Sequence, residues 1–161
     1  MKADLLEITG GLIELLAKRQ ETVTAVESCT GGLISAAIVD VPGASRVFCQ
    51  GLVTYSNEAK ERLAFVRAET LAAFGAVSAE TAAEMACGGA RAAGATLGIA
   101  PTGIAGPGGA TPDKPVGLVY IGVYYNGSTF VERHVFAGSR DEIRRQAVER
   151  ALSYAKSIVE Q

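Results

Sequence analysis

The spacing of apolar residues predicts amphipathic helices at both ends of the chain. Over residues 3–19 apolar side chains recur every three to four positions with charged residues between them, which is the period of a helix with one buried face. Ser139 and Glu142 form a Ser-x-x-Glu capping box, so a last helix is predicted to begin there and to run to about residue 159. The apolar positions of the first helix are Leu5, Ile8, Leu12, Leu15 and Leu16.

Two strand and helix units are predicted in the first half of the chain. Residues 22–26 are β-branched and apolar, and a sharp turn leads from them into an apolar helix over residues 33–39. Residues 47–55 have the composition of a second strand. Because a helix connects the two strands, we expect them to pair in parallel.

Short helices are predicted over residues 58–74. A longer helix is predicted over 79–93, with Ser78 as its N-cap and Gly94 at its end, and a strand follows over 95–101. Residues 116–125 and 129–136 flank Asn126-Gly127, a strong type I′ signal for an antiparallel hairpin. Together these elements predict one domain over residues 1–161. Its fold class is α/β, a three-layer α/β/α sandwich on a mixed, mostly parallel five-stranded sheet that includes a C-terminal β-hairpin.

The net charge and the cysteine spacing indicate which binding partners and which cellular compartment to expect. The net charge is −2 and no run of lysine or arginine occurs, so we expect no direct binding of nucleic acid. Acidic residues interrupt the first helix, which predicts neither a signal peptide nor a membrane span. Cys29, Cys49 and Cys87 form no Cys-x-x-Cys pair, so reduced thiols in the cytoplasm are expected.

The segment from Glu27 to Gly32, Glu-Ser-Cys-Thr-Gly-Gly, joins the first strand to its helix. Two glycines let the backbone approach a ligand, and the helix after them directs unpaired N–H groups at an oxyanion or a phosphate. The alternative is a tight turn in which Thr30 caps the helix. Cys29 is a rival nucleophile to Ser28, and His134, the only histidine, is expected on a sheet face, which leaves a Ser-Lys dyad open.

Three further segments could line a site. Residues 55–60, Tyr-Ser-Asn-Glu-Ala-Lys, follow the second strand, where open α/β sheets place ligand-binding loops. Residues 101–115 form a long Gly/Pro loop that suits close contact with a flat ring or a ribose, or is a surface loop. The arginines at the start of the last helix could bind a phosphate or be merely solvated. These are Arg140, Arg144 and Arg145.

Several separated motifs, in order, resemble the CinA C-terminal domain, a family of nicotinamide-nucleotide amidases. The resemblance runs from about residue 5 to residue 157, and it carries most of the functional interpretation. Phe74 departs from the polar residue or histidine that this family often has there. The motifs are Glu27-Ser-Cys-Thr-Gly-Gly32, Tyr55-Ser-Asn-Glu-Ala-Lys60, Gly75-Ala-Val-Ser78, Thr102-Gly-Ile-Ala-Gly-Pro107 and Lys114-Pro-Val-Gly117.

The resemblance implies an amidohydrolase that converts nicotinamide mononucleotide to nicotinate mononucleotide and ammonia, without cofactor or metal. Ser28 would be the nucleophile and Lys60 the base, and Thr30, Gly31 and Gly32 would form the oxyanion pocket. The remaining residues implied to order the site or bind the substrate are Tyr55, Asn57, Thr102, Gly103, Arg140 and Arg144.

Two other interpretations of the sequence stay open. A non-catalytic nucleotide-binding module could use the same loop and arginines as a sensor or as a partner-docking domain in competence or the DNA-damage response. The apolar first helix and the edge of the hairpin could also support a homodimer or a larger homo-oligomer.

Overall fold

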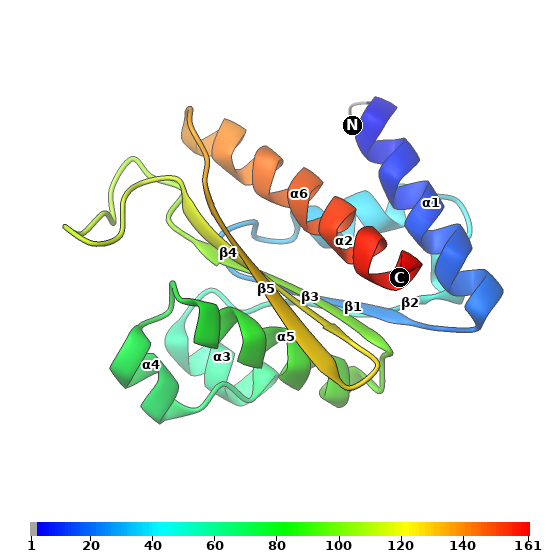
Figure 1. Ribbon diagram of the computed structural model, residues 1–161, viewed down its shortest axis with the longest axis horizontal. Helices are drawn as coiled ribbons and strands as arrows, with labels where there is room; N and C mark the ends of the chain where they lie inside the picture. The colour runs from blue at the N-terminus through cyan, green and yellow to red at the C-terminus, as the bar shows by residue number, and fades with distance from the viewer. Residues whose placement is uncertain (1–2) are drawn as a thin grey trace.

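A computed structural model describes residues 3–161, and its centre is one five-stranded sheet in the order β2-β1-β3-β4-β5 (Figure 1). β1 pairs in parallel with both β2 and β3, whereas β3 with β4 and β4 with β5 are antiparallel. Four strands therefore run in one direction and β4 runs against them, which confirms the mixed, mostly parallel sheet. The strands are β1 (Val23–Glu27), β2 (Phe48–Val53), β3 (Leu97–Gly103), β4 (Leu118–Tyr125) and β5 (Ser128–Val135).

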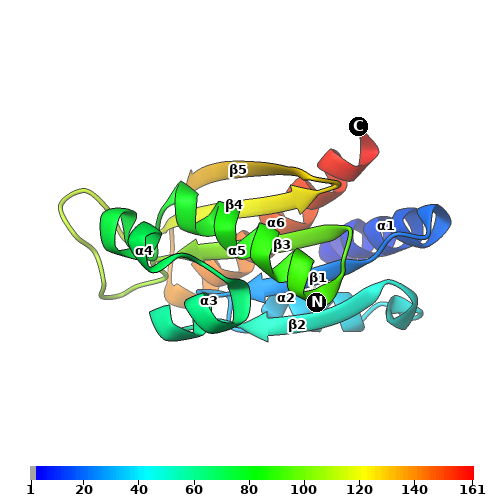
Figure 2. The same cartoon turned by 90° about the horizontal axis from the view of Figure 1, so that it is seen from below.

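Helices cover both faces of the sheet, as the sandwich prediction requires. Helices α1, α2 and α6 lie on one face, and α3, α4 and α5 lie on the other (Figures 1 and 2). Buried aliphatic side chains fill both interfaces. None of the helices in residues 3–161 is long and apolar enough to cross a membrane. The helices are α1 (Ala3–Arg19), α2 (Leu33–Val39), α3 (Asn57–Ala64), α4 (Ala68–Phe74), α5 (Ala79–Ala93) and α6 (Arg140–Glu160).

Glycines in the sheet let α5 lie directly on the strands. A Cβ at Gly98 of β3 would lie 2.3 Å from the carbonyl oxygen of Ala86, and one at Gly122 of β4 would lie 2.2 Å from that of Ala82. Both distances are shorter than any carbon to oxygen contact allows, so the backbone of the helix occupies the space that side chains would take. This contact fixes the position of α5 against the middle of the sheet.

Several local predictions are confirmed. Ser139 accepts a hydrogen bond from the N–H of Glu142 and completes the capping box. Asn126 and Gly127 have φ values of 47° and 93°, the left-handed pair that a type I′ hairpin needs. The third strand lies two residues later than the predicted 95–101, because the N–H of Ala95 still closes the end of α5 on Ala90. As a consequence Thr102 and Gly103 belong to β3 and not to the loop after it.

Candidate active site

The carboxyl ends of the three parallel strands meet at one edge of the sheet. Ser28 follows β1, Tyr55 follows β2, and Thr102 lies near the end of β3. Together with α3 and the start of α6 they surround a cavity of about 250 Å³. Six of the predicted site residues line it, namely Ser28, Tyr55, Lys60, Thr102, Gly103 and Arg140.

Lys60 contacts Ser28 inside this cavity. Its Nζ donates a hydrogen bond to Ser28 Oγ at 2.9 Å and another to the carbonyl oxygen of Thr54 at 2.7 Å. Ser56 positions this lysine, because its Oγ caps the first turn of α3 by accepting from the N–H of Ala59. The Lys60 side chain is only 1% exposed, and this burial lowers its pKa to about 8. A lysine with that pKa is partly neutral near neutral pH, which a proton acceptor must be.

Glu27 is the residue that the sequence analysis missed. It is the last residue of β1, it has no exposed surface, and its carboxylate accepts five hydrogen bonds from the turn and the start of α2. The carboxylate thus occupies the helix N-terminus, where the sequence analysis expected an oxyanion or a phosphate. The only signal in the sequence is an acidic residue at the end of a β-branched and apolar stretch. The five donors are Thr30 Oγ1, the N–H groups of Gly32, Ile34 and Ser35, and Ser35 Oγ.

Several donors of the predicted oxyanion pocket have partners within the turn. The Thr30 hydroxyl and the N–H of Gly32 are committed to Glu27, and the N–H of Gly31 donates to the carbonyl of Ser28 at 3.1 Å. The place of Gly31 and Gly32 in an oxyanion pocket stays a prediction. Their φ values of 59° and 99° explain why the turn needs glycine at both positions. The N–H groups of Cys29 and Thr30 donate to no backbone carbonyl within residues 3–161.

The two predicted phosphate ligands lie in different surroundings. Arg140 lines the cavity, where its Nη2 donates to the Tyr55 hydroxyl at 3.0 Å and its Nη1 to the carbonyl of Gly106 at 2.7 Å. Arg144 does not line it, and its guanidinium donates instead to the carbonyl oxygens of Cys29 and Thr30. The contact of Arg144 with a phosphate stays a prediction, and the hydrogen bonds that the structure shows for its guanidinium go to the turn.

Other predicted residues differ in what they contact. Asn57 is exposed at the first position of α3 and is not among the residues that line the cavity, so its role in ordering the site stays a prediction. The Thr102 hydroxyl is buried and donates to the carbonyl of Ala76 at 2.7 Å, which ties β3 to the segment before α5. Lys114 Nζ donates to the carbonyl of Phe74 at 2.6 Å and holds the long loop against α4.

The structure supports neither Cys29 as the nucleophile nor His134 as the base. Burial raises the pKa of the Cys29 thiol to about 12, so the thiolate that a nucleophile needs is disfavoured at neutral pH. His134 lies on β5, where its Nε2 is 2.8 Å from Glu132 and its ring stacks on Phe136, and it does not line the cavity. A Ser-His-Asp triad is therefore absent from the cavity, and Lys60 is the basic group that contacts Ser28.

Comparison with known proteins gives matches over most of the chain. The family model of the CinA C-terminal domain matches residues 6–159. The chain is 51% identical over 145 residues to a CinA-like protein of Kosmotoga olearia and 50% identical over 146 residues to a putative competence-damage inducible protein of Clostridium botulinum. These matches cover 90% and 91% of this chain, but only 35% and 36% of those relatives.

Solved structures show the same fold over nearly the whole chain. The competence/damage inducible protein CihA of Agrobacterium tumefaciens superposes with a TM-score of 0.95 at 39% identity, covering 100% of this chain and 98% of that one. A CinA superfamily protein of Escherichia coli superposes with a TM-score of 0.92 at 31% identity, covering 100% and 93%. The chain therefore belongs to the CinA C-terminal domain family.

Proposed function

We propose that this chain is an amidase that converts nicotinamide mononucleotide to nicotinate mononucleotide and ammonia. The observation that carries the proposal is the 2.9 Å contact between Lys60 Nζ and Ser28 Oγ in a buried site that lowers the pKa of the lysine to about 8. A hydroxyl nucleophile needs an adjacent proton acceptor, and this lysine meets that need. The substrate itself comes from the resemblance to nicotinamide-nucleotide amidases.

The reaction begins with proton transfer from Ser28 Oγ to neutral Lys60. The oxygen then attacks the carboxamide carbon, and the negative charge moves to the carbonyl oxygen, which accepts hydrogen bonds from the N–H groups of Cys29 and Thr30. Protonated Lys60 returns the proton to the leaving nitrogen, so the carbon–nitrogen bond breaks with release of ammonia. Water, deprotonated by the same lysine, cleaves the resulting ester and regenerates Ser28.

The cavity suits the reacting end of such a substrate. At about 250 Å³ it is smaller than the roughly 300–1,000 Å³ of pockets that enclose a whole small ligand. We place the pyridine ring and its carboxamide inside, with the ribose and the phosphate outside, towards Tyr55 and Arg140. The Tyr55 side chain is 63% exposed at the rim, and the Arg140 guanidinium beside it supplies the positive charge that a phosphate needs.

Ammonia release from nicotinamide mononucleotide in the presence of EDTA tests the proposal. We expect turnover by the wild-type protein and background release by Ser28→Ala and Lys60→Ala. Ser157→Ala, an exposed serine on α6, is the matched control and should keep full activity. Saturable binding of the nucleotide without ammonia release would contradict the proposal and support a nucleotide-binding sensor or docking module instead.

A further inference from the structure

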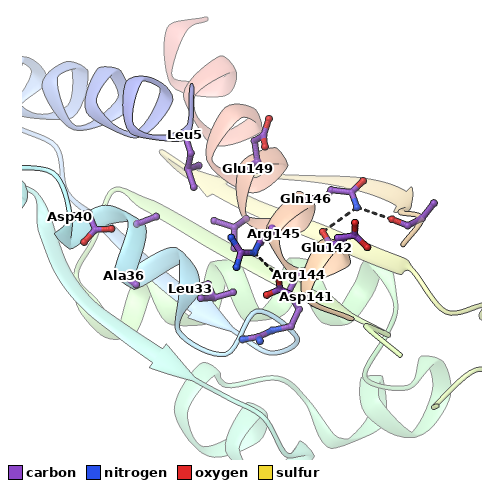
Figure 3. Close-up of a pocket in the computed structure, with 13 residues that line it drawn as sticks. Leu5, Leu33, Ala36, Asp40, Asp141, Glu142, Arg144, Arg145, Gln146 and Glu149 are labelled. Carbon is purple, nitrogen blue, oxygen red and sulfur yellow. Dashed lines mark hydrogen bonds and ion pairs between the residues drawn. The ribbon is translucent and has the colours of Figure 1, made fainter. Parts of the chain in front are cut away.

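Arg144 reaches from α6 to the turn that carries Ser28. Figure 3 shows its side chain extending from the helix towards the turn ahead of α2. Its Nε donates to the carbonyl oxygen of Cys29 at 3.1 Å, and its Nη2 donates to that of Thr30 at 2.8 Å. One guanidinium therefore holds two consecutive carbonyl groups, which its rigid fork of donors is shaped to do and a lysine is not.

These contacts fix the direction of the peptide groups in the turn. A trans peptide is planar, so its N–H points opposite to its carbonyl. When Arg144 holds the carbonyl of Cys29, the N–H of Thr30 is directed away from the guanidinium. In the same way the N–H of Gly31 holds the carbonyl of Ser28 and sets the direction of the N–H of Cys29. Neither N–H group donates to a backbone carbonyl within the described residues 3–161.

Arg144 acts from outside the cavity. It lines a separate groove of about 460 Å³ between α2 and α6, and not the cavity that Ser28 and Lys60 line. Glu27 also holds this turn, because its carboxylate accepts hydrogen bonds from the N–H groups at the start of α2. The turn is thus fixed on two sides by an anion and a cation that are both distinct from the reacting groups.

We infer that Arg144 is a positioning residue for the reaction at Ser28, which orients the N–H groups that receive the oxyanion and does not contact the phosphate of the substrate. The inference rests on the proposed function. A misdirected oxyanion donor weakens binding of the transition state, whereas a lost phosphate ligand weakens binding of the substrate. The two roles therefore predict different kinetic constants.

The test compares nicotinamide mononucleotide with nicotinamide riboside, which lacks the phosphate. Loss of one oxyanion donor lowers kcat by about 10²–10³-fold, so we expect Arg144→Gln to lower kcat to that extent for both substrates with little change in KM. Arg144→Lys should recover only a small part of the loss. Arg91→Gln is the control, since Arg91 is exposed near the end of α5 and does not line the cavity. An increase in KM confined to the phosphorylated substrate would overturn the inference.

A second readout separates this inference from the proposed function. A fluorophosphonate forms a phosphonate ester with an activated serine and releases fluoride. Negative charge builds up on the phosphoryl oxygen during the attack, so the rate of attachment to Ser28 depends on the same N–H groups and needs no amide substrate. We expect labelling of the wild-type protein and labelling at least tenfold slower in Arg144→Gln at an unchanged melting temperature. If the wild type releases no ammonia but this difference holds, only the proposed function fails. Equal rates, or no labelling of the wild type, would overturn the inference.

Discussion

Lys60 provides the sharpest prediction, because its role as a base depends on one measurable quantity. Burial moves the pKa of this lysine from 10.5 to about 8, and only the neutral form accepts the proton of Ser28. Lowering the pH protonates Lys60 and should stop the reaction. Replacing it with alanine should remove both the base and the titration.

The expected size of the effect follows from the two pKa values. At pH 7 a group with a pKa of about 8 is neutral in roughly one molecule in eleven, whereas at 10.5 it would be neutral in roughly one in three thousand. Burial thus raises the reactive population about 300-fold at neutral pH. A positioned general base contributes about 10²–10⁴-fold to the rate, so Lys60→Ala should lose at least 10²-fold in kcat/KM.

The assay is a profile of kcat/KM against pH from 6 to 10. We expect kcat/KM to rise about tenfold per pH unit at the acidic end and to level above an apparent pKa near 8. In Lys60→Ala the residual kcat/KM should no longer rise with pH in this way. Added methylamine should restore part of the lost activity, and more of it as the pH rises and the amine becomes neutral. Lys18→Ala is the control, because Lys18 is exposed on α1 and pairs with Glu14.

Two results would refute this reasoning. One is a flat profile between pH 6 and 9 for the wild-type protein, which would mean that no group with the pKa of Lys60 controls the reaction. The other is an unchanged limb in Lys60→Ala, which would assign the titration to a different group. Melting temperatures of both proteins at each pH ensure that a loss of rate is not a loss of fold.

The remaining predictions concern three other positions. Cys29→Ala should keep at least half of the wild-type kcat, because the pKa of this thiol is about 12, and loss of all activity would revive a thiol mechanism. Glu27→Gln should lower the free energy of unfolding, measured in urea, by about 3 kcal/mol or more. The amide nitrogen of the glutamine would face N–H and O–H donors that the carboxylate now accepts from. A change below about 1 kcal/mol would show that those hydrogen bonds contribute little to stability. Gly122→Ala should destabilise the fold by at least about 2 kcal/mol, because the added Cβ would clash with the backbone of Ala82. Gly10→Ala has open space around it and should stabilise α1 by about 0.5–1 kcal/mol. A higher melting temperature for Gly122→Ala than for Gly10→Ala would contradict this view of the packing.

Elements with strong local signals could be predicted from the sequence. The capping box at Ser139, the helix end at Gly94 and the turn at Asn126-Gly127 each depend on residues close in the chain, and all three are confirmed. The start of β3 could not be placed to the residue, because Ala95 and Thr96 suit a strand as well as a helix end. Its position is decided by the hydrogen bond between Ala95 and Ala90.

The candidate site could be predicted only in part, for the same physical reason. Ser28 directly follows β1, and Lys60 lies in the first turns of the helix that follows β2. The two side chains meet because these neighbouring strands are parallel, which the sequence pattern implied. The burial that lowers the pKa of Lys60 depends on the packing of α3 and is invisible in the sequence. The contact of Arg144 with Cys29 joins residues 115 positions apart, so reasoning from neighbouring residues left this arginine either solvated or a candidate for the phosphate of the substrate.

The central claim, that Ser28 is the nucleophile of an amide hydrolysis, is tested most directly by locating the acyl group. Wild-type protein would be mixed with nicotinamide mononucleotide, quenched in acid within the first turnovers, and digested for mass spectrometry. The account predicts that the substrate, less ammonia, is esterified to the peptide containing residue 28, and that the adduct is absent in Ser28→Ala. Acylation of Cys29 instead, or full turnover by Ser28→Ala, would contradict it.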